Sequence, residues 1–416
     1  MTILKYNGEI SDISADTIEF IDNVLTKKFG FENKKVRIEP VGKIGDNFAS
    51  QVKRIIVEDD SEPFGMLLKS LPVIEDTAEA VFDVQLLFNN EILMYEILSK
   101  FKDFQTNAGI PKTDQFKFPQ CYGFGIKKDF ILLEDLKISN FTMLDKFEPL
   151  SNDCVNIVLK KFAMFHGLSY VLKYQEPEKY KDLKEGLVDP FNSKEHFISQ
   201  FQMTLELIEK DTINIVDQEK YKNVLKNSLS QMISYTAVLD NNAEMSQYSV
   251  ITHGDCWTNN ILFQIKEGKP VECILIDYQL SKHRSPAWDL LHMIFNCTNS
   301  ASRHDYYLEW IDYYHSELDK SLSYFGLKSE IVYPRYELDA DLKKYAKILF
   351  SHSVFATMMV MRKPEDSLIL KEAMDEQDVD KFTEAMKASN LDEDSKKRTK
   401  NIIEGLIDTV LEFNLM

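Results

Sequence analysis

The sequence contains no paired cysteine motif, no long apolar run and no excess of basic residues. Its five cysteines include no C-x-x-C pair, which argues against a zinc site and favours a reducing compartment. No stretch approaches the length of a membrane span, and the first ten residues hold no apolar core of a signal peptide. We therefore expect a cytoplasmic protein without membrane insertion.

The charge balance also excludes a class of partner. The formal net charge is −18 over 416 residues, whereas a nucleic-acid binder needs a basic face. Hydrophobic residues make up 44% of the chain, enough for an ordinary globular core. We find no internal repeat, no low-complexity segment and no sign of an obligate protein partner. A chain of this length favours two lobes over one small domain.

One stretch, residues 250–277, concentrates the polar side chains that could carry chemistry. Asp255 and Asn260 lie on a loop, and two apolar segments follow, residues 261–265 and 271–276, separated by a Gly/Pro turn. This pattern predicts a β-hairpin. The hairpin returns the chain to the loop and delivers Asp277 beside it.

These three side chains suit phosphoryl transfer. Asn260 and Asp277 offer the oxygen ligands that Mg²⁺ prefers. Asp255 is then free to orient an attacking hydroxyl and take its proton. Alternatively, Asp255 could cap a turn and Asp277 could be a solvated carboxylate at a strand end. The apolar strand before Asp277 favours the functional interpretation, because loops at the ends of buried strands often carry function.

Two motifs carry a family resemblance: H-G-D-x-W-x-N-N at residues 253–260 and I-D-Y-Q at residues 276–279. They resemble the signature of the CHK kinase-like proteins, the ecdysteroid-kinase-like branch of the choline kinase and aminoglycoside phosphotransferase superfamily. The resemblance extends over about residues 36–330. It implies a two-lobed, protein-kinase-like α+β fold. A small antiparallel-sheet lobe would span residues 1–134, and a large, mainly helical lobe residues 135–416.

The first strands flank a glycine-containing loop. Strands are expected at residues 36–41 and 48–57, and the turn between them could lay backbone N–H groups over phosphates. A plain hairpin turn explains the same pattern equally well. The family resemblance implies a nucleotide loop here, with Gly45, Asn47 and Ser50 near the phosphates.

A buried ion pair is predicted in the same lobe. Lys69 ends an apolar strand, where a buried ammonium needs a partner. Glu91 lies near the inward face of a helix expected at residues 79–100. Kinases hold the α- and β-phosphates with such a pair. Glu96 is the alternative partner, and a snorkelling Lys69 with a solvated Glu91 is the structural alternative.

The segment after this helix leads to an adenine site that only the resemblance implies. A connecting loop is expected at residues 101–120, followed by a hairpin formed by residues 121–126 and 130–133. By resemblance, the next residues form the hinge between the lobes. The backbone groups of Glu134 and Leu136 would then meet adenine.

An amphipathic helix is predicted at residues 14–29, and a strongly apolar helix behind a polar cap is predicted at residues 151–173. His166 on the second of these is expected to be a core histidine. Two helical segments are expected within residues 193–246. Asp289 is expected either to cap the helix that it opens or to brace the catalytic loop.

The remaining polar and aromatic side chains are less specific. His283 and Arg284 could meet phosphate, but we expect them on a solvated loop. The aromatic stripe within residues 306–325 is more typical of a core than of a ligand site. The acidic end of the chain, residues 337–416, is expected to be helical and to belong to the large lobe.

Together these features predict an enzyme that uses ATP and Mg²⁺ to phosphorylate a small-molecule acceptor with a free hydroxyl. By resemblance the acceptor is an ecdysteroid-like steroid or a xenobiotic alcohol. A choline- or ethanolamine-type kinase is the alternative enzyme, and a non-catalytic pseudokinase or a ligand carrier are the alternatives from other classes. Gln279 replaces the glycine of D-F-G, and no A-P-E segment is present, which disfavours protein substrates.

Overall fold

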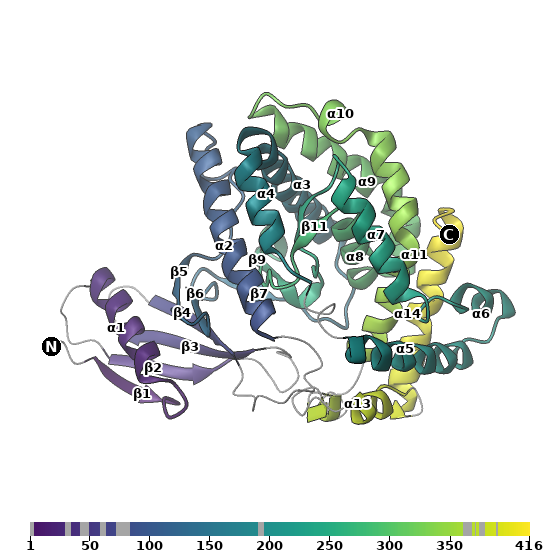
Figure 1. Cartoon of the computed structure of the whole chain (residues 1–416), viewed down its shortest axis with the longest axis horizontal. Helices are drawn as coiled ribbons and strands as arrows, with labels where there is room; N and C mark the ends of the chain where they lie inside the picture. The colour runs from purple at the N-terminus through teal and green to yellow at the C-terminus, as the bar shows by residue number, and fades with distance from the viewer. Residues whose placement is uncertain are drawn as a thin grey trace.

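The computed structural model combines a sheet at one end with a larger helical body (Figure 1). The described residues are 4–29, 35–41, 50–58, 64–71, 84–189, 195–360, 368–370, 372–373, 379–387 and 390–416. No helix within these ranges is long and apolar enough to cross a membrane. All five cysteines are described, and none forms a disulfide.

The sheet has six strands in the order β1-β2-β3-β4-β6-β5. Their bounds are β1 Lys5–Gly8, β2 Lys35–Pro40, β3 Gln51–Glu58, β4 Phe64–Ser70, β5 Cys121–Phe124 and β6 Phe130–Glu134. The pairs are antiparallel except at the edge, where β1 lies parallel to β2. Strand β1 was not predicted, because four residues of mixed polarity give no strand period.

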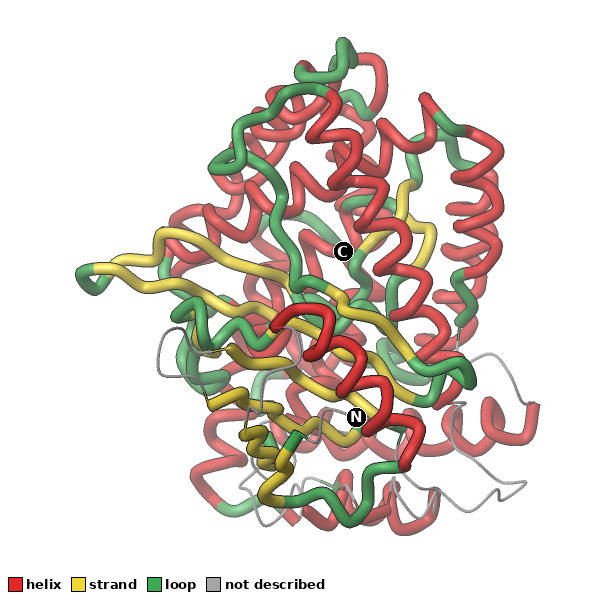
Figure 2. The backbone as a smooth tube through the Cα atoms, turned by 90° about the vertical axis from the view of Figure 1, so that its left-hand side faces the viewer, coloured by secondary structure: helices red, strands yellow, loops and turns green. Residues whose placement is uncertain are grey.

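Helix α1 (Ala15–Phe29) crosses one face of this sheet, as Figure 2 shows. Ile21 and Leu25 are buried on this face against Val36 and Ile55. The predicted helix at residues 14–29 is therefore present, and its apolar stripe is what attaches it to the sheet.

Helix α2 (Val84–Asn107) is longer than expected. The loop predicted to begin at residue 101 is wrong for its first seven residues. The reason is that Phe101, Phe104 and Gln105 continue the buried face. Gln105 also bonds the backbone of Phe116 through both its oxygen and its nitrogen. Packing therefore holds the last two turns in place.

The rest of the chain is mainly helical. The helices are α3 Asn152–Gln175, α4 Pro177–Gly186, α5 Glu195–Ile215, α6 Glu219–Leu225, α7 Met232–Met245, α8 Ala287–Cys297, α9 Ser300–Ser323, α10 Ser329–Val332, α11 Arg335–Val360, α13 Val379–Met386 and α14 Glu393–Glu412. Ser151 caps α3 through its side chain. Residues 193–246 hold three helices rather than the expected two. A single apolar pattern concealed the break between α5 and the short α6.

Helices α3 and α9 form the centre of this body. The stripe on α9 contributes buried Tyr307, Trp310 and Tyr314, so its core interpretation is correct for these three. Trp310 donates its indole N–H to Asn152 at 2.7 Å, which ties the start of α3 to α9. The buried indole N–H is thereby satisfied.

Two small sheets carry the loops of residues 253–260 and 277–281. Strand β8 (Val250–Thr252) pairs with β11 (Lys282–Arg284). Strand β9 (Ile261–Lys266) lies between β10 (Lys269–Leu275) and β7 (Phe141–Met143). The predicted hairpin of residues 261–276 is therefore formed, with its turn at Glu267 and Gly268.

The expectation of a solvated loop at His283 and Arg284 is wrong. Both side chains are buried on β11. His283 Nδ1 lies 2.8 Å from the Tyr180 hydroxyl, and Arg284 Nε donates to Asp240 at 2.7 Å. Pairing of β11 with the buried strand β8 places these polar residues inside, where each finds a partner.

Candidate active site

The hairpin of β9 and β10 brings Asn260 and Asp277 together. Asn260 ends a short 3₁₀ turn, Thr258–Asn260, and its carbonyl accepts the N–H of Ile276 at 3.0 Å. Asp277 follows directly in a left-handed conformation, with φ of 65°. Such a backbone is uncommon outside glycine, and it persists where the surrounding structure imposes it. The chain thus redirects the Asp277 side chain at the end of the strand.

The loop that carries Asp255 is held by Asp289. The two Asp289 oxygens accept the backbone N–H groups of His253 at 2.7 Å and Gly254 at 2.9 Å. His166 Nε2 lies 3.0 Å from the same carboxylate. Asp289 therefore braces the loop, and it does not cap α8, whose N-cap position is Pro286. His166 is a buried core histidine, as expected.

Burial would raise the pKa of Asp289, but the hydrogen bond and charge of His166 and the backbone N–H of Gly254 lower it overall. The carboxylate therefore stays ionised although it is fully buried. A buried anion of this kind needs all its bonds, since an uncompensated charge in the interior is costly. The brace is consequently rigid.

Gly254 and His253 fix the course of the loop. Gly254 has a φ of 85°, and a Cβ there would lie 2.0 Å from the Leu280 carbonyl oxygen. Only glycine fits this close approach. His253 Nε2 lies 3.0 Å from the Ile276 oxygen, and because a carbonyl only accepts, this nitrogen carries the hydrogen. The bond links the loop to the residue before Asp277.

Asp255 is held by Asn260. The Asn260 amide nitrogen donates to the Asp255 backbone oxygen at 2.8 Å and to its Oδ2 at 3.1 Å. Burial, followed by the charge of Asp277, raises the pKa of Asp255 to about 8. The amide nitrogen of Asn260 is turned toward Asp255, so its oxygen is free for a cation. Two carboxylates and one amide oxygen therefore converge at this edge.

Lys69 joins the same cluster from the sheet. Its Nζ lies 2.6 Å from Glu91 Oε2 and 2.9 Å from Asp277 Oδ1. Burial alone would lower the pKa of Lys69, but the Asp277 and Glu91 carboxylates outweigh it and raise the pKa. Glu96, the alternative partner, is exposed and pairs with Lys179 instead. Residues 208 positions apart in the chain are thus in direct contact.

The other predicted nucleotide residues lie at the sheet. Glu134 ends β6, and its Oε2 accepts the backbone N–H of Gln120 at 3.1 Å. Leu136 is buried just beyond. Ser50 is half-buried immediately before β3. Gly45 and Asn47 lie outside the described residues, so the structure adds nothing about them.

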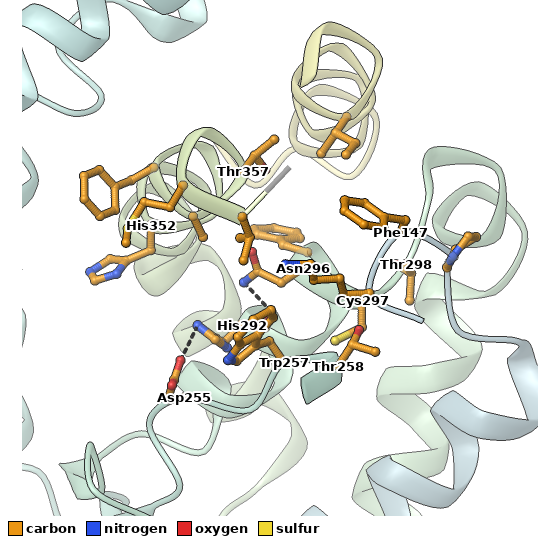
Figure 3. Close-up of a pocket in the computed structure, with 18 of the residues that line it drawn as sticks. Phe147, Asp255, Trp257, Thr258, His292, Asn296, Cys297, Thr298, His352 and Thr357 are labelled. Carbon is orange, nitrogen blue, oxygen red and sulfur yellow. Dashed lines mark hydrogen bonds and ion pairs between the residues drawn. The ribbon is translucent and has the colours of Figure 1, made fainter. Parts of the chain in front are cut away.

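A cavity of about 550 Å³ opens beside Asp255. Figure 3 shows Asp255 and His292 at one end and Phe147 and Thr298 toward the other. Apolar and aromatic residues make up about half of the lining, which comes mainly from α5, α8, α9, α11, α13, α14 and the segment before α3. Apolar walls that also carry polar side chains such as Asp255 and His292 are typical of a small-molecule site.

The family model of the ecdysteroid kinase-like family matches residues 44–327, more than half of the chain. The chain belongs to this family. Its fold is accordingly the two-lobed protein-kinase-like fold. No curated protein matches the chain.

Solved structures are similar to this family member at low identity. Ethanolamine kinase from Plasmodium vivax shares 15% identity, with 90% of this chain and 88% of that chain covered and a TM-score of 0.44. A GDP complex of wild-type aminoglycoside 2'-phosphotransferase-IIIa shares 13% identity, with 91% and 97% covered and a TM-score of 0.43.

Two parts of this ecdysteroid kinase-like site escaped sequence reasoning. The first is His292, whose Nε2 lies 3.7 Å from Asp255 Oδ1. Its position one turn after Asp289 on α8 was a usable signal, because residues three apart share a helix face. The second is the cavity wall, which combines segments from Leu87 to Ile402. No short motif joins such distant residues.

Proposed function

We propose that this protein transfers the γ-phosphoryl group of ATP to a hydroxyl of a small molecule held in the cavity beside Asp255. One observation carries the proposal. Lys69, Asp255, Asn260 and Asp277 form one connected cluster, and Asp255 also lines the cavity. The phosphoryl donor ATP, the metal ligands and the acceptor hydroxyl could therefore meet at a single point, as in-line transfer requires.

The cluster suits a divalent cation. The charge of Asp277 helps to raise the pKa of Asp255. A bound cation would relieve the repulsion between the two carboxylates. Asn260 and Asp277 would hold Mg²⁺, with phosphate oxygens and water completing its coordination. Within the described ranges, no three His, Cys, Asp or Glu side chains form a metal cluster, so a dedicated protein cage is not part of this proposal. When bound, the cation neutralises charge on the phosphates.

Lys69 is suited to hold phosphate. Glu91 fixes the ammonium, and Asp277 shares it, so the charge lies between the sheet and the metal ligands. Backbone groups of Glu134 and Leu136 would meet adenine. The Leu136 oxygen already accepts from Ser139 and Phe141, which leaves its N–H for the base. In this proposal the nucleotide lobe ends at residue 134, and residues 135–416 hold the acceptor.

Asp255 acts on the acceptor. Its Oδ2 is bonded by Asn260, so Oδ1 is the atom that receives the hydroxyl proton. As the hydroxyl oxygen forms a bond to the γ-phosphorus, the bond from that phosphorus to the β,γ-bridging oxygen breaks and ADP leaves, while the hydroxyl proton moves to Asp255. The pKa of Asp255, about 8 without a cation, makes it a stronger base than an ordinary carboxylate, and the cation bound beside it would keep it ionised until it takes the proton. The preorganised loop then supplies positioning rather than covalent chemistry.

The cavity favours an uncharged, mostly apolar alcohol such as an ecdysteroid-like steroid or a xenobiotic alcohol. Among its described lining residues, Asp255 and Glu148 are the carboxylates, whereas Lys146, Arg303 and Arg398 are cationic. The lining has aromatic rings that could contact the cation of a choline- or ethanolamine-type acceptor, but its three cationic side chains outnumber its two carboxylates and would repel such a cation. A pseudokinase would be expected to lack the base or a metal ligand, yet both are present.

The test is ATP consumption with Mg²⁺ in the presence of sterols, plant glycosides or choline. Wild type and Asp255→Asn are compared, with Asp305→Asn as the matched control because Asp305 is exposed on α9. We expect turnover on a member of the sterol or glycoside groups, lost only in Asp255→Asn. Mg²⁺-dependent ATP binding without turnover on any acceptor would favour the pseudokinase, and absence of ATP binding would contradict the whole proposal.

A further inference from the structure

Two side chains at one end of the cavity can present acceptor atoms to the same space. Asp255 Oδ1 and His292 Nε2 are 3.7 Å apart, and both residues line the cavity (Figure 3). The separation is too long for a direct hydrogen bond between them. A ligand entering the cavity therefore meets both atoms.

The hydrogen of His292 is assigned by its other contact. His292 Nδ1 lies 3.2 Å from the Cys256 backbone oxygen. A carbonyl oxygen can only accept, so Nδ1 carries the hydrogen. Burial lowers the pKa of His292 to about 4, so the ring is neutral at pH 7 and has a single N–H. Nε2 is consequently an acceptor with an available lone pair.

Asp255 contributes the second acceptor. Asn260 bonds its Oδ2 and its backbone oxygen, so Oδ1 is the carboxylate oxygen that faces His292. One hydroxyl has one hydrogen to donate. With Asp255 ionised, as the transfer step requires, a lone hydroxyl placed here would satisfy Asp255 and leave His292 Nε2 facing an oxygen lone pair. A buried acceptor left in that state costs binding free energy.

We propose that the acceptor carries two hydroxyls on adjacent carbons, and that His292 Nε2 accepts a hydrogen bond from the hydroxyl next to the reacting one. The reacting hydroxyl donates to Asp255 Oδ1. Each oxygen then lies about 2.8 Å from its own acceptor, a spacing that neighbouring carbons can supply. His292 is thus a specificity-determining residue for vicinal diols. This inference rests on the phosphotransfer proposed above.

The experiment uses three steroids with one skeleton: estriol and 16-epiestriol, which carry adjacent hydroxyls at carbons 16 and 17, and 17β-estradiol, which lacks the one at carbon 16. Affinity for the full-length protein is measured by calorimetry with Mg²⁺–ADP present, so that the cation keeps Asp255 ionised, and kcat/KM is then measured with Mg²⁺–ATP. We expect at least one diol to bind about 10-fold more tightly than estradiol, the effect of one hydrogen bond.

Two substitutions separate recognition from structure. His292→Asn keeps a donor at the position of Nδ1 for the Cys256 oxygen but removes the acceptor at Nε2. His292→Gln places an amide oxygen near Nε2 instead. We expect the Asn variant to bind estradiol as tightly as the steroids with adjacent hydroxyls, and the Gln variant to retain most of the preference. Unchanged circular dichroism and Mg²⁺–ATP affinity verify the fold of both.

Equal affinity of wild type for the diols and estradiol would overturn this inference, as would binding of none of the three, and either result leaves the proposed phosphotransfer standing on its own test. A diol preference that survives in His292→Asn would also overturn it. Diol preference in binding without any phosphorylation would uphold the role of His292 in recognition and contradict the proposed function. The two failures are therefore distinguishable.

Discussion

The catalytic edge and the acceptor cavity share Asp255 but are built in opposite ways. The edge, formed by Lys69, Glu91 and residues 253–289, is polar and tightly bonded, with each charge held by a named partner. The cavity is mostly apolar, and its wall gathers segments between Leu87 and Ile402. If the proposed function holds, the comparison teaches that the chemistry depends on a few well-defined polar contacts, whereas acceptor choice depends on many apolar contacts.

The difference sets distinct expectations for substitutions. A substitution at the edge that changes a single functional atom should alter kcat for every acceptor. In the cavity, one side chain changed should alter affinity for some acceptors and leave the nucleotide site intact. The following predictions test this division, from the largest expected effect to the smallest.

Asp255→Asn removes the group that takes the proton and keeps its shape. We expect kcat to fall by about 10³-fold for every acceptor, within the range of lost general bases, with ATP affinity little changed. Steady-state kinetics on two unrelated acceptors measures this. Asp305→Asn is the control, and a loss confined to one acceptor would contradict the role of Asp255 as a common base.

Lys69→Met removes a buried cation and leaves Glu91 and Asp277 facing each other. We expect kcat/KM for ATP to fall about 10²-fold, and stability to fall by about 3 kcal/mol because breaking a buried pair leaves an uncompensated charge. Chemical denaturation and kinetics measure the two effects. Adding Glu91→Gln should restore part of the stability without restoring activity. If the stability does not recover, the two carboxylates do not repel each other in the Lys69→Met variant.

Asp289→Asn weakens the brace under the catalytic loop. An amide can accept only through its oxygen, so one of the N–H groups of His253 and Gly254 loses its partner. We expect kcat to fall about 10- to 100-fold through misplacement of Asp255, while acceptor affinity stays within about twofold of wild type. Kinetics with calorimetry separates the two. Weaker acceptor binding with unchanged kcat would show that Asp289 acts on the cavity and not on the position of Asp255.

Phe355→Ala trims the cavity wall. Phe355 packs edge-on against Phe201 with ring centroids 5.6 Å apart, and both line the cavity. We expect acceptor KM to rise about 10-fold, the value of a lost aromatic contact, with ATP KM unchanged. The exposed Tyr336 on α11 provides the matched control, Tyr336→Ala. A change in ATP KM would show that cavity and edge are not separable.

The pH dependence of stability gives the smallest effect. The folded-state pKa of Asp255, about 8, lies above the unfolded value of about 4, so ionising this carboxyl costs folded-state stability. Without metal or nucleotide, Asp255→Asn should match wild type near pH 4 and become more stable between pH 4 and 8, by a few degrees in Tm, with no further gain above pH 8. Thermal melts in EDTA measure this. A difference in Tm between the two proteins that stays constant from pH 4 to 8 would contradict a raised pKa for Asp255.

The same comparison explains how far the sequence predicted the structure. The hairpin of residues 261–276, the pairing of Lys69 with Glu91 and the return of Asp277 to the loop followed from local patterns and the need of a buried ammonium for a partner. The buried positions of His283 and Arg284 did not, because they depend on pairing with Ile251 and Val250, which lie 32 and 34 residues earlier in the chain. The cavity wall was also beyond reach, since it exists only after α8, α11 and α14 have packed.

The most direct test of the account is the product itself. Wild type and Asp255→Asn are incubated with Mg²⁺–ATP and a pool of hydroxylated steroids, and the mixture is followed by ³¹P NMR. We predict that a phosphomonoester signal grows with wild type and is absent with Asp255→Asn, which still binds Mg²⁺–ATP. Equal signals from both proteins, or failure of wild type to bind Mg²⁺–ATP, would contradict the central claim.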